Sequence, residues 1–353
     1  MINITKNNNM AVSNKPKLEF YRFQLDHKAD GYKTFRDFAV DNLGISATSS
    51  NKDIFKKIFE YFMNAPEKDF AKNEQLKKVF TWIDDPSINI HHDKKPSINT
   101  SSYTISGVIN GGRYSDDSIL SDVTNKKQSR KLKRDNSVLK YYYIFLYIPV
   151  DYSEGFMMIH SNNSEDTITN LMRTYIAKLF KRGDYRKPIF EKFCPKSFQD
   201  EFRKGATISN FNFKTTIVND IPGDDPFLFQ LDGYDVSITI SPKNKKMDFG
   251  DCGKTLMAFF SKGAFRGHKE TNELNKFDKI KVSTKNEKTK SSNTFEWNSR
   301  DKEFTPVVYL DNRVKMSDNN TPDFVDLKRY CIELFNGQIL PEIRPDLNIG
   351  YVD

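Results

Sequence analysis

The first hundred residues change from strand-like to helix-like spacing of their apolar positions. Residues 17–25 (KLEFYRFQL) alternate well enough to predict a first β-strand. Apolar side chains then recur at helical spacing over residues 54–63 and again over residues 76–83, and each segment ends shortly before a proline. This spacing predicts two helices. Residues 84–102 are polar, contain two prolines and predict a loop.

The middle of the chain predicts antiparallel strands and a covering helix. Within SYTISGVINGGRYSDDSILSDV, Asn-Gly-Gly at residues 110–112 favours a tight turn and predicts a hairpin. Residues 141–150 (YYYIFLYIPV) and 155–161 (GFMMIHS) predict a second hairpin, whose first strand is apolar on both faces and therefore central. Residues 168–180 form an amphipathic pattern that ends at Gly183 and predicts a helix packed on one face of this sheet.

The second half of the chain is dominated by strand-like segments between two helical ones. A helix is predicted over residues 188–204, and a closing helix over residues 324–335 is expected to stop at Asn336-Gly337. Strands are predicted at residues 207–218, 236–240, 279–283, 294–298 and 305–310.

Together these patterns predict an α+β fold with a mainly antiparallel sheet and packed helices, organised in two regions. Residues 1–16 lack periodicity and predict a flexible tail. We expect an N-terminal α+β domain over residues 17–185 and a C-terminal β-rich α+β domain over residues 186–353. The length of 353 residues suits two domains.

Composition narrows the class of protein. The chain is 37% hydrophobic and contains 29 Phe, which excludes wholesale disorder. The longest apolar stretch, residues 141–150, is half of the roughly 20 residues that a membrane helix needs, and the N-terminus has no apolar signal core. Three scattered cysteines form no CxxC and so indicate neither a disulfide framework nor a zinc site. We therefore expect a soluble, cytoplasmic protein without membrane insertion.

Charge points to polyanions as partners. The chain has 55 Lys and Arg against 47 Asp and Glu, a formal net charge of +8. The cations gather in a first basic cluster (Lys126, Lys127, Arg130, Lys131, Lys133 and Arg134) and a second basic cluster (Lys178, Lys181, Arg182, Arg186 and Lys187). Clustered cations suffice for nonspecific binding of DNA or RNA, although an ordinary solvated surface shows the same pattern. Tyrosines follow the first cluster at residues 141–147, and most of these are expected in the core.

Catalytic candidates are few. Gly250–Thr255 (GDCGKT) lacks the first glycine of a phosphate-binding loop, because Asp248 stands in its place. Asp116 and Asp117 are a pair of carboxylates that would hold Mg²⁺ in a nuclease. His160 ends a predicted central strand, where a general acid or base is conceivable and a structural histidine is more usual. No cofactor is evident apart from Mg²⁺ in the nuclease alternative.

One part of the chain resembles a known group of proteins. GVINGGRYSDDSILSDV, followed by YYYIFLYIPVDYSEGFMMIHSNNSEDTITNLM, is similar to a pattern in poorly characterised bacterial proteins encoded near antiphage systems. In these proteins a Gly-x-Ile-x-Gly-Gly-x-Tyr hairpin precedes a strand that ends in Ile-Pro and a second strand that leads to a helix. The resemblance covers residues 107–180. It implies structural roles for Gly111, Gly112, Pro149 and Gly155 and a setting in phage defence, without a catalytic motif.

The resemblance thus implies a bacterial antiphage defence component, and the two basic clusters predict that it contacts DNA or RNA. One alternative is a Mg²⁺-dependent nuclease effector that uses Asp116 and Asp117. A second alternative is a protein–protein adaptor whose basic surface meets an acidic partner within a multi-component defence complex.

Overall fold

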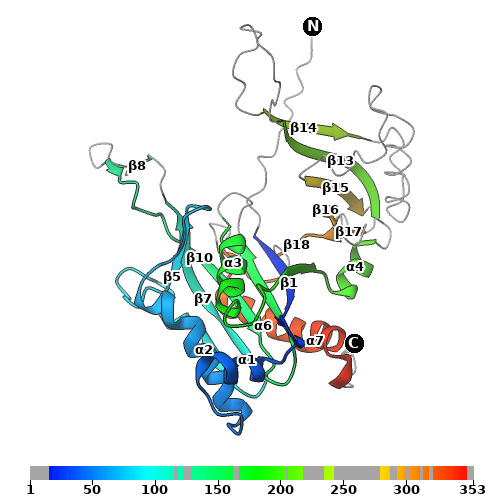
Figure 1. The fold of residues 1–353 in the computed structure, drawn as a ribbon. Coiled ribbons are helices and arrows are strands. Elements are labelled where there is room, and N and C mark those ends of the chain that lie inside the picture. Colours follow the sequence, from blue (N-terminus) through cyan, green and yellow to red (C-terminus); the bar gives the residue numbers. More distant parts are fainter. Residues whose placement is uncertain are drawn as a thin grey trace, which may run out of the picture. The chain divides into compact units, whose positions relative to one another are not determined.

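The protein has an α+β fold (Figure 1). The computed structural model describes residues 16–114, 118–121, 124, 129–161, 167–203, 206–217, 234–241, 279–286, 292–298, 303–310, 313–317 and 321–347. The chain divides into two compact units. Unit 1 comprises Met1–Phe193 and Tyr309–Asp353, and unit 2 comprises Cys194–Val308.

Unit 1 is built on a nine-stranded sheet whose main path runs β12-β1-β11-β10-β7-β5-β4, with β6 paired to β7 beside it. Neighbouring strands along this path run antiparallel. The strands of the sheet are β1 (Lys17–Gln24), β4 (Ala71–Asn73), β5 (Lys78–Thr81), β6 (Ser97–Asn99), β7 (Thr104–Arg113), β10 (Lys140–Tyr147), β11 (Glu154–Ser161), β12 (Phe190–Phe193) and β18 (Val308–Tyr309). Two small ribbons pair β2 (Asp26–His27) with β3 (Gly31–Tyr32), and β8 (Ser118–Leu120) with β9 (Arg130–Leu132).

Three helices cover one face of this sheet, in front of the strands in Figure 1. They are α1 (Phe35–Leu43), α2 (Asn51–Lys68) and α3 (Thr169–Phe180). Helix α1 begins at a capping box, in which the Thr34 side chain accepts from the Asp37 backbone and the Asp37 side chain accepts from the Thr34 backbone. Side chains of the three helices and of the facing strand positions form one buried apolar core. The helix predicted over residues 54–63 is confirmed as α2, which continues past Pro66.

The opposite face carries the C-terminal helices, behind the strands in Figure 1. Helix α6 (Phe324–Leu334) continues through a π-helical turn, η5 (Phe335–Ile339), into α7 (Leu340–Ile343). The ring of Phe335 lies 5.0 Å from Phe145, 4.9 Å from Tyr147 and 6.0 Å from Phe156. The predicted stop at Gly337 is therefore wrong, because burial of Phe335 against the sheet outweighs the local tendency of glycine to end a helix.

The division into units differs from the expected boundary at residue 186. The segment from Tyr309 belongs to unit 1, because α6 and η5 bury their apolar side chains on the sheet of that unit. Residues 188–204, predicted as one helix, form β12 and the short helix α4 (Lys196–Arg203). Strand β12 forms because Phe190 pairs with Phe23 of β1 and stacks on its ring at 4.7 Å. Pro195 lies between the two elements.

Two further predictions are wrong because both segments are strands that pair with each other in the sheet. Residues 76–83 are not helical, since residues 78–81 form β5, which pairs with β7. The Asn-Gly-Gly at residues 110–112 is not a turn but the continuation of β7. A Cβ atom on Gly111 would lie 2.9 Å from the Ile168 side chain, and one on Gly112 would lie 2.3 Å from the Val138 carbonyl oxygen. These glycines allow close approach within a packed sheet rather than a change of chain direction.

The hairpin predicted over residues 141–161 is confirmed as β10 and β11, and the helix over residues 168–180 as α3. Unit 2 contains a five-stranded antiparallel sheet in the order β14-β13-β15-β16-β17. Its strands are β13 (Ala206–Ile217), β14 (Tyr234–Ile240), β15 (Lys279–Asn286), β16 (Ser292–Asn298) and β17 (Glu303–Pro306), close to the predicted segments. The short 3₁₀ helices η1 (His92–Lys94) and η6 (Pro345–Leu347) complete the described elements.

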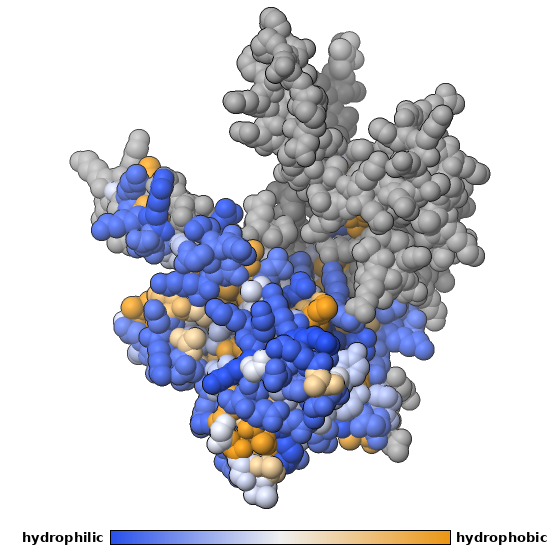
Figure 2. All heavy atoms as spheres, viewed as in Figure 1, coloured by the Kyte–Doolittle hydropathy of each residue, from blue (hydrophilic) through white to orange (hydrophobic). Residues whose placement is uncertain are grey.

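The surface of unit 1 is largely polar on its helical side. Figure 2 shows this face as mostly hydrophilic, with hydrophobic residues in small separate patches. Within the described ranges, no helix has both the length and the apolar character needed to span a membrane.

Candidate nucleic-acid interface

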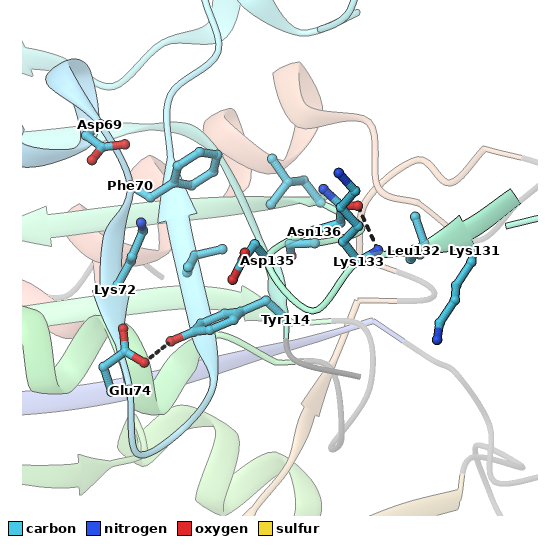
Figure 3. A pocket seen from close by; sticks show the side chains of 13 residues that line it. Asp69, Phe70, Lys72, Glu74, Tyr114, Lys131, Leu132, Lys133, Asp135 and Asn136 are labelled. Carbon is cyan, nitrogen blue, oxygen red and sulfur yellow. Dashed lines mark hydrogen bonds between the residues drawn. The ribbon is translucent and has the colours of Figure 1, made fainter. Parts of the chain in front are cut away.

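A cavity of about 870 Å³ lies at the end of the sheet where β4 is the last strand on the main path (Figure 3). Its lining comes from the β4–β5 hairpin, from Tyr114 after β7, and from residues 131–139 before β10. Lys131 and Lys133 of the first basic cluster are part of this lining. We call it the edge cavity.

Local hydrogen bonds fix the segments on both sides of the edge cavity. The Asn73 side chain accepts from the backbone N–H groups of Gln75 and Leu76, at 3.0 Å each, which closes the β4–β5 turn. Across the cavity, the Lys133 backbone N–H donates to the Asn136 side chain at 2.9 Å. These side-chain bonds hold the backbone that carries the cavity lysines.

A further pair of contacts ties the two segments to the end of β7. The Tyr114 N–H donates to the Lys77 carbonyl at 3.0 Å, and the Ser137 hydroxyl donates to the Arg113 carbonyl at 2.9 Å. Tyr114 and Ser137 also form an isolated antiparallel bridge. Tyr114 therefore lies at a fixed place between the hairpin and the lysine-bearing segment.

Two aromatic rings border the edge cavity, and each has a lysine above its face. The Lys72 ammonium lies 6.0 Å from the centroid of the Phe70 ring, and the Lys77 ammonium lies 5.8 Å from that of Tyr114. Phe70 is 40% exposed, which is unusual for so large an apolar side chain. Both rings are seen at the cavity in Figure 3.

The Tyr114 hydroxyl donates a hydrogen bond to Glu74 at 2.8 Å, drawn as a dashed line in Figure 3. Partial burial, together with this bond and the charge of Glu74, raises the pKa of Tyr114 to about 12. The same bond lowers the pKa of Glu74. At neutral pH the hydroxyl is therefore protonated and bonded to a carboxylate, which holds the ring in place.

The charged groups of the edge cavity are of both signs. Lys72, Lys131 and Lys133 face the same space as three carboxylates, those of Asp69, Glu74 and Asp135. Ammonium groups suit phosphate oxygens, and carboxylates accept hydrogen bonds from the amino groups of bases. Aromatic faces stack on unpaired bases. The lining thus offers partners to the phosphate and to the base of a nucleotide.

The second basic cluster lies away from the edge cavity. Arg186 forms an ion pair with Asp26 at 2.7 Å, and the Arg182 guanidinium lies 5.7 Å from the centroid of the Tyr61 ring on α2. Lys187 lines a different cavity beside α3. The two other members, Lys178 and Lys181, are exposed. No member of this cluster lines the edge cavity, so that cavity contains part of the first cluster and none of the second.

Other members of the first cluster fall partly outside the structure's described ranges. Lys126 and Lys127 lie outside them, and of Arg130 only the backbone, in β9, is described. Arg134 is exposed directly after Lys133.

In the part of the chain that it describes, the structure does not bring the catalytic candidates together in one site. Asp116 and Asp117 lie outside the described ranges. His160 is completely buried, with its ring 5.9 Å from Phe324 and 6.4 Å from Tyr142, and it lines neither cavity. Among the residues that the structure describes, no group of three His, Cys, Asp or Glu side chains could hold a metal ion.

Comparison with known protein families, curated proteins and solved structures found no match. The reading of the edge cavity therefore depends on its own chemistry.

Sequence reasoning missed Phe70, Lys72 and Tyr114 as members of a site. The first two lie beside a segment, residues 76–83, that was interpreted as a helix, so the hairpin that carries them was not foreseen. Tyr114 belonged to the Gly-Gly-x-Tyr pattern, and its position after two glycines was the available signal. Tyr142, Tyr143 and Tyr147 are buried, which confirms the expectation that most tyrosines near the first cluster belong to the core.

Proposed function

We propose that the protein binds single-stranded nucleic acid in the edge cavity, as a component of bacterial antiphage defence. The observation that carries the binding proposal is the shared lining of two aromatic rings, Phe70 and Tyr114, with Lys131 and Lys133. Single-strand-binding proteins combine these two elements, since rings stack on bases while cations track the phosphates. The defence setting rests on the resemblance carried by residues 107–180.

The aromatic rings favour a single strand over a duplex. In a duplex the base faces are covered by their neighbours, so a ring at the protein surface has no face to stack on. Unpaired bases expose their faces, and the amino groups on their edges are donors for Glu74 or Asp135. The mixed charge of the lining therefore suits base and phosphate together better than phosphate alone.

Removal of the exposed ring is expected to weaken binding. Phe70→Ala should lower the affinity for a single-stranded oligonucleotide by roughly 5- to 100-fold, because one stacked base is lost. Tyr114→Phe keeps the ring and should bind within about twofold of the unmodified protein, whereas Tyr114→Ala should lose affinity as Phe70→Ala does. Fluorescence anisotropy with labelled single-stranded and duplex DNA and RNA, at one fixed salt concentration, measures these affinities.

Tyr32→Ala is the matched control for this series, since Tyr32 is a 68% exposed aromatic residue that is not part of the cavity lining. Equal loss in Tyr32→Ala and Phe70→Ala would contradict the proposal. Tighter binding of duplex than of single-stranded nucleic acid, by the unmodified protein and by every variant, would also contradict it. Parallel incubation with Mg²⁺ or EDTA reports cleavage, which would favour the nuclease alternative, and absence of any binding would favour the adaptor.

The salt dependence tests the lysines separately from the rings. Lys133→Ala should reduce the slope of log affinity against log salt concentration by about one, because one phosphate contact is removed. Lys52 is an exposed lysine on α2 that is not part of the cavity lining, so Lys52→Ala should leave the slope unchanged. Titration with the same oligonucleotide at a series of salt concentrations gives both slopes, and an unchanged slope for Lys133→Ala would remove this residue from the interface.

A further inference from the structure

A second cavity, of about 490 Å³, lies on the opposite side of the β4–β5 hairpin. Its lining comes from the hairpin turn, from α3 and from residues 187–190. Successive residues of a strand face opposite sides, so Lys72 lines the edge cavity while Asn73 lines this one. We call it the α3 cavity. Its volume falls in the range of about 300–1,000 Å³ that is usual for small-molecule sites.

The charge of the α3 cavity is unlike that of the edge cavity. Two cations, Arg173 and Lys187, line it, and no carboxylate does. The neighbouring Arg186, in contrast, has an acidic partner, since it pairs with Asp26 at 2.7 Å. Among the described residues, no carboxylate lies within ion-pair distance of Arg173 or Lys187. The α3 cavity therefore carries two positive charges that no carboxylate of its described lining neutralises.

The Arg173 guanidinium is held in place by contacts that do not neutralise it. It lies 4.7 Å from the centroid of the Tyr21 ring and 5.9 Å from that of Phe190. One of its terminal nitrogens donates to the Phe190 carbonyl at 3.3 Å, and the other lies 3.5 Å from the Asn170 side-chain oxygen. A guanidinium stacked on rings and bonded only to neutral oxygens is oriented in advance for an anionic ligand.

The remaining lining has both polar donors and an apolar wall. Asn73, Gln75 and Asn170 supply amide groups. Leu76 and Ile189 supply the apolar part, and Ile189 is 74% exposed, a large apolar side chain left in water. An anion with an attached ring would bury this side chain while its charge meets the cations.

We propose that the α3 cavity binds a small phosphate-bearing ligand of the mononucleotide class, with the phosphate between Arg173 and Lys187 and the ring against Ile189 and Leu76. Two cations and several amide donors match the three oxygens and double charge of a phosphate better than the single charge of a carboxylate. This site is distinct from the edge cavity and does not depend on nucleic-acid binding there.

The test is isothermal titration of the whole chain with adenosine 5′-monophosphate, with adenosine and with inorganic phosphate. Adenosine 5′-monophosphate is expected to bind, phosphate to bind more weakly, and adenosine to give no measurable heat. Lys187→Glu should weaken binding of the monophosphate by roughly tenfold or more, the factor that one lost charge-assisted hydrogen bond produces. Lys187 is exposed, so this variant should fold normally.

Lys52→Glu makes the same charge change on α2, outside the lining, and should leave binding unchanged. Arg173→Lys keeps the charge and loses the planar fork, and should also weaken binding. Absence of monophosphate binding, or equal binding by the unmodified protein and Lys187→Glu, overturns the proposal. Loss of oligonucleotide affinity in Lys187→Glu without monophosphate binding also overturns it, because the cavity then belongs to the nucleic-acid surface.

Discussion

Phe23→Ala is expected to lower the free energy of unfolding by about 3 to 5 kcal/mol, the usual cost of removing a fully buried aromatic ring. Phe23 is 1% exposed. Its ring centroid lies 4.7 Å from that of Phe190 and 6.0 Å from those of Phe35 and Phe180, so one side chain joins β1 to β12, α1 and α3. Its loss leaves a cavity at a point where four elements meet.

Gly155 gives an independent test of the same packing. A Cβ atom on Gly155 would lie 2.4 Å from the tip of the Phe23 ring, so Gly155→Ala should cost about 1 to 3 kcal/mol through overpacking. Leucine lacks the outer ring atoms that cause this clash. The double variant Gly155→Ala/Phe23→Leu should therefore lose less than the sum of its two single variants, by about 1 kcal/mol.

Urea denaturation followed by circular dichroism gives these free energies. Tyr32→Ala, which removes an exposed ring, should change the free energy of unfolding by less than about 0.5 kcal/mol. A loss below about 1 kcal/mol for Phe23→Ala would show that the ring is not packed as the structure has it. Additive costs in the Gly155→Ala/Phe23→Leu double variant would exclude a direct contact between the two residues.

The second large effect is expected where α7 ends. Arg344 is 4% exposed, and its guanidinium donates to both Asp346 oxygens, at 2.9 Å and 2.8 Å, and to the Tyr147 hydroxyl at 3.0 Å. Asp346→Ala should lower the free energy of unfolding by about 2 to 3 kcal/mol, because the buried charge of Arg344 loses its main partner. The cost is smaller than for a fully buried pair because Asp346 is half exposed.

Removing the charge itself should do less harm. Arg344→Met keeps the packing over the Tyr152 ring, whose centroid lies 4.4 Å from the guanidinium, and leaves Asp346 in contact with water. The double variant Arg344→Met/Asp346→Ala should consequently be more stable than Asp346→Ala alone. Chemical denaturation of the three variants tests this order, and a double variant less stable than Asp346→Ala would show that the cost comes from lost packing.

The same pair predicts a dependence on pH. The hydrogen bond from Arg344 holds the pKa of Asp346 below its ordinary value. A lowered pKa in the folded state means that the pair stabilises the protein above the ordinary carboxyl pKa, and that this stabilisation disappears as pH falls through the folded-state pKa. The difference between the unmodified protein and Asp346→Ala should be full near neutral pH and shrink below about pH 4. A difference that is independent of pH would contradict the ion pair.

The local pattern of apolar and polar residues predicts an element correctly where that element depends mainly on its own residues. The β10–β11 hairpin was predicted because two apolar runs flank a short polar turn, and α3 because its apolar positions repeat at helical spacing. Residues 110–112 show the limit of this approach. Asn-Gly-Gly favours a turn locally, yet the glycines are needed because Ile168 and Val138 approach the strand from distant parts of the chain.

The candidate site shows the same limit. Charge clustering in the sequence indicated Lys131 and Lys133, but nothing local connected them with Phe70, which lies about 60 residues earlier in the chain. They come together because β5 pairs with the end of β7, opposite the segment that precedes β10. The second basic cluster has five cations against the six of the first, and the fold places its members elsewhere.

The sequence by itself determined the α+β class, most of the strands and helices, and the excess of positive charge, because periodicity and composition are properties of neighbouring residues. Only the tertiary structure decided that the C-terminal helices pack on the first sheet and that two cavities flank the β4–β5 hairpin. The physical reason is that such contacts join residues far apart in the chain, as when Arg344 bonds Tyr147 across 197 positions. Their free energy depends on complementary packing, which no local pattern encodes.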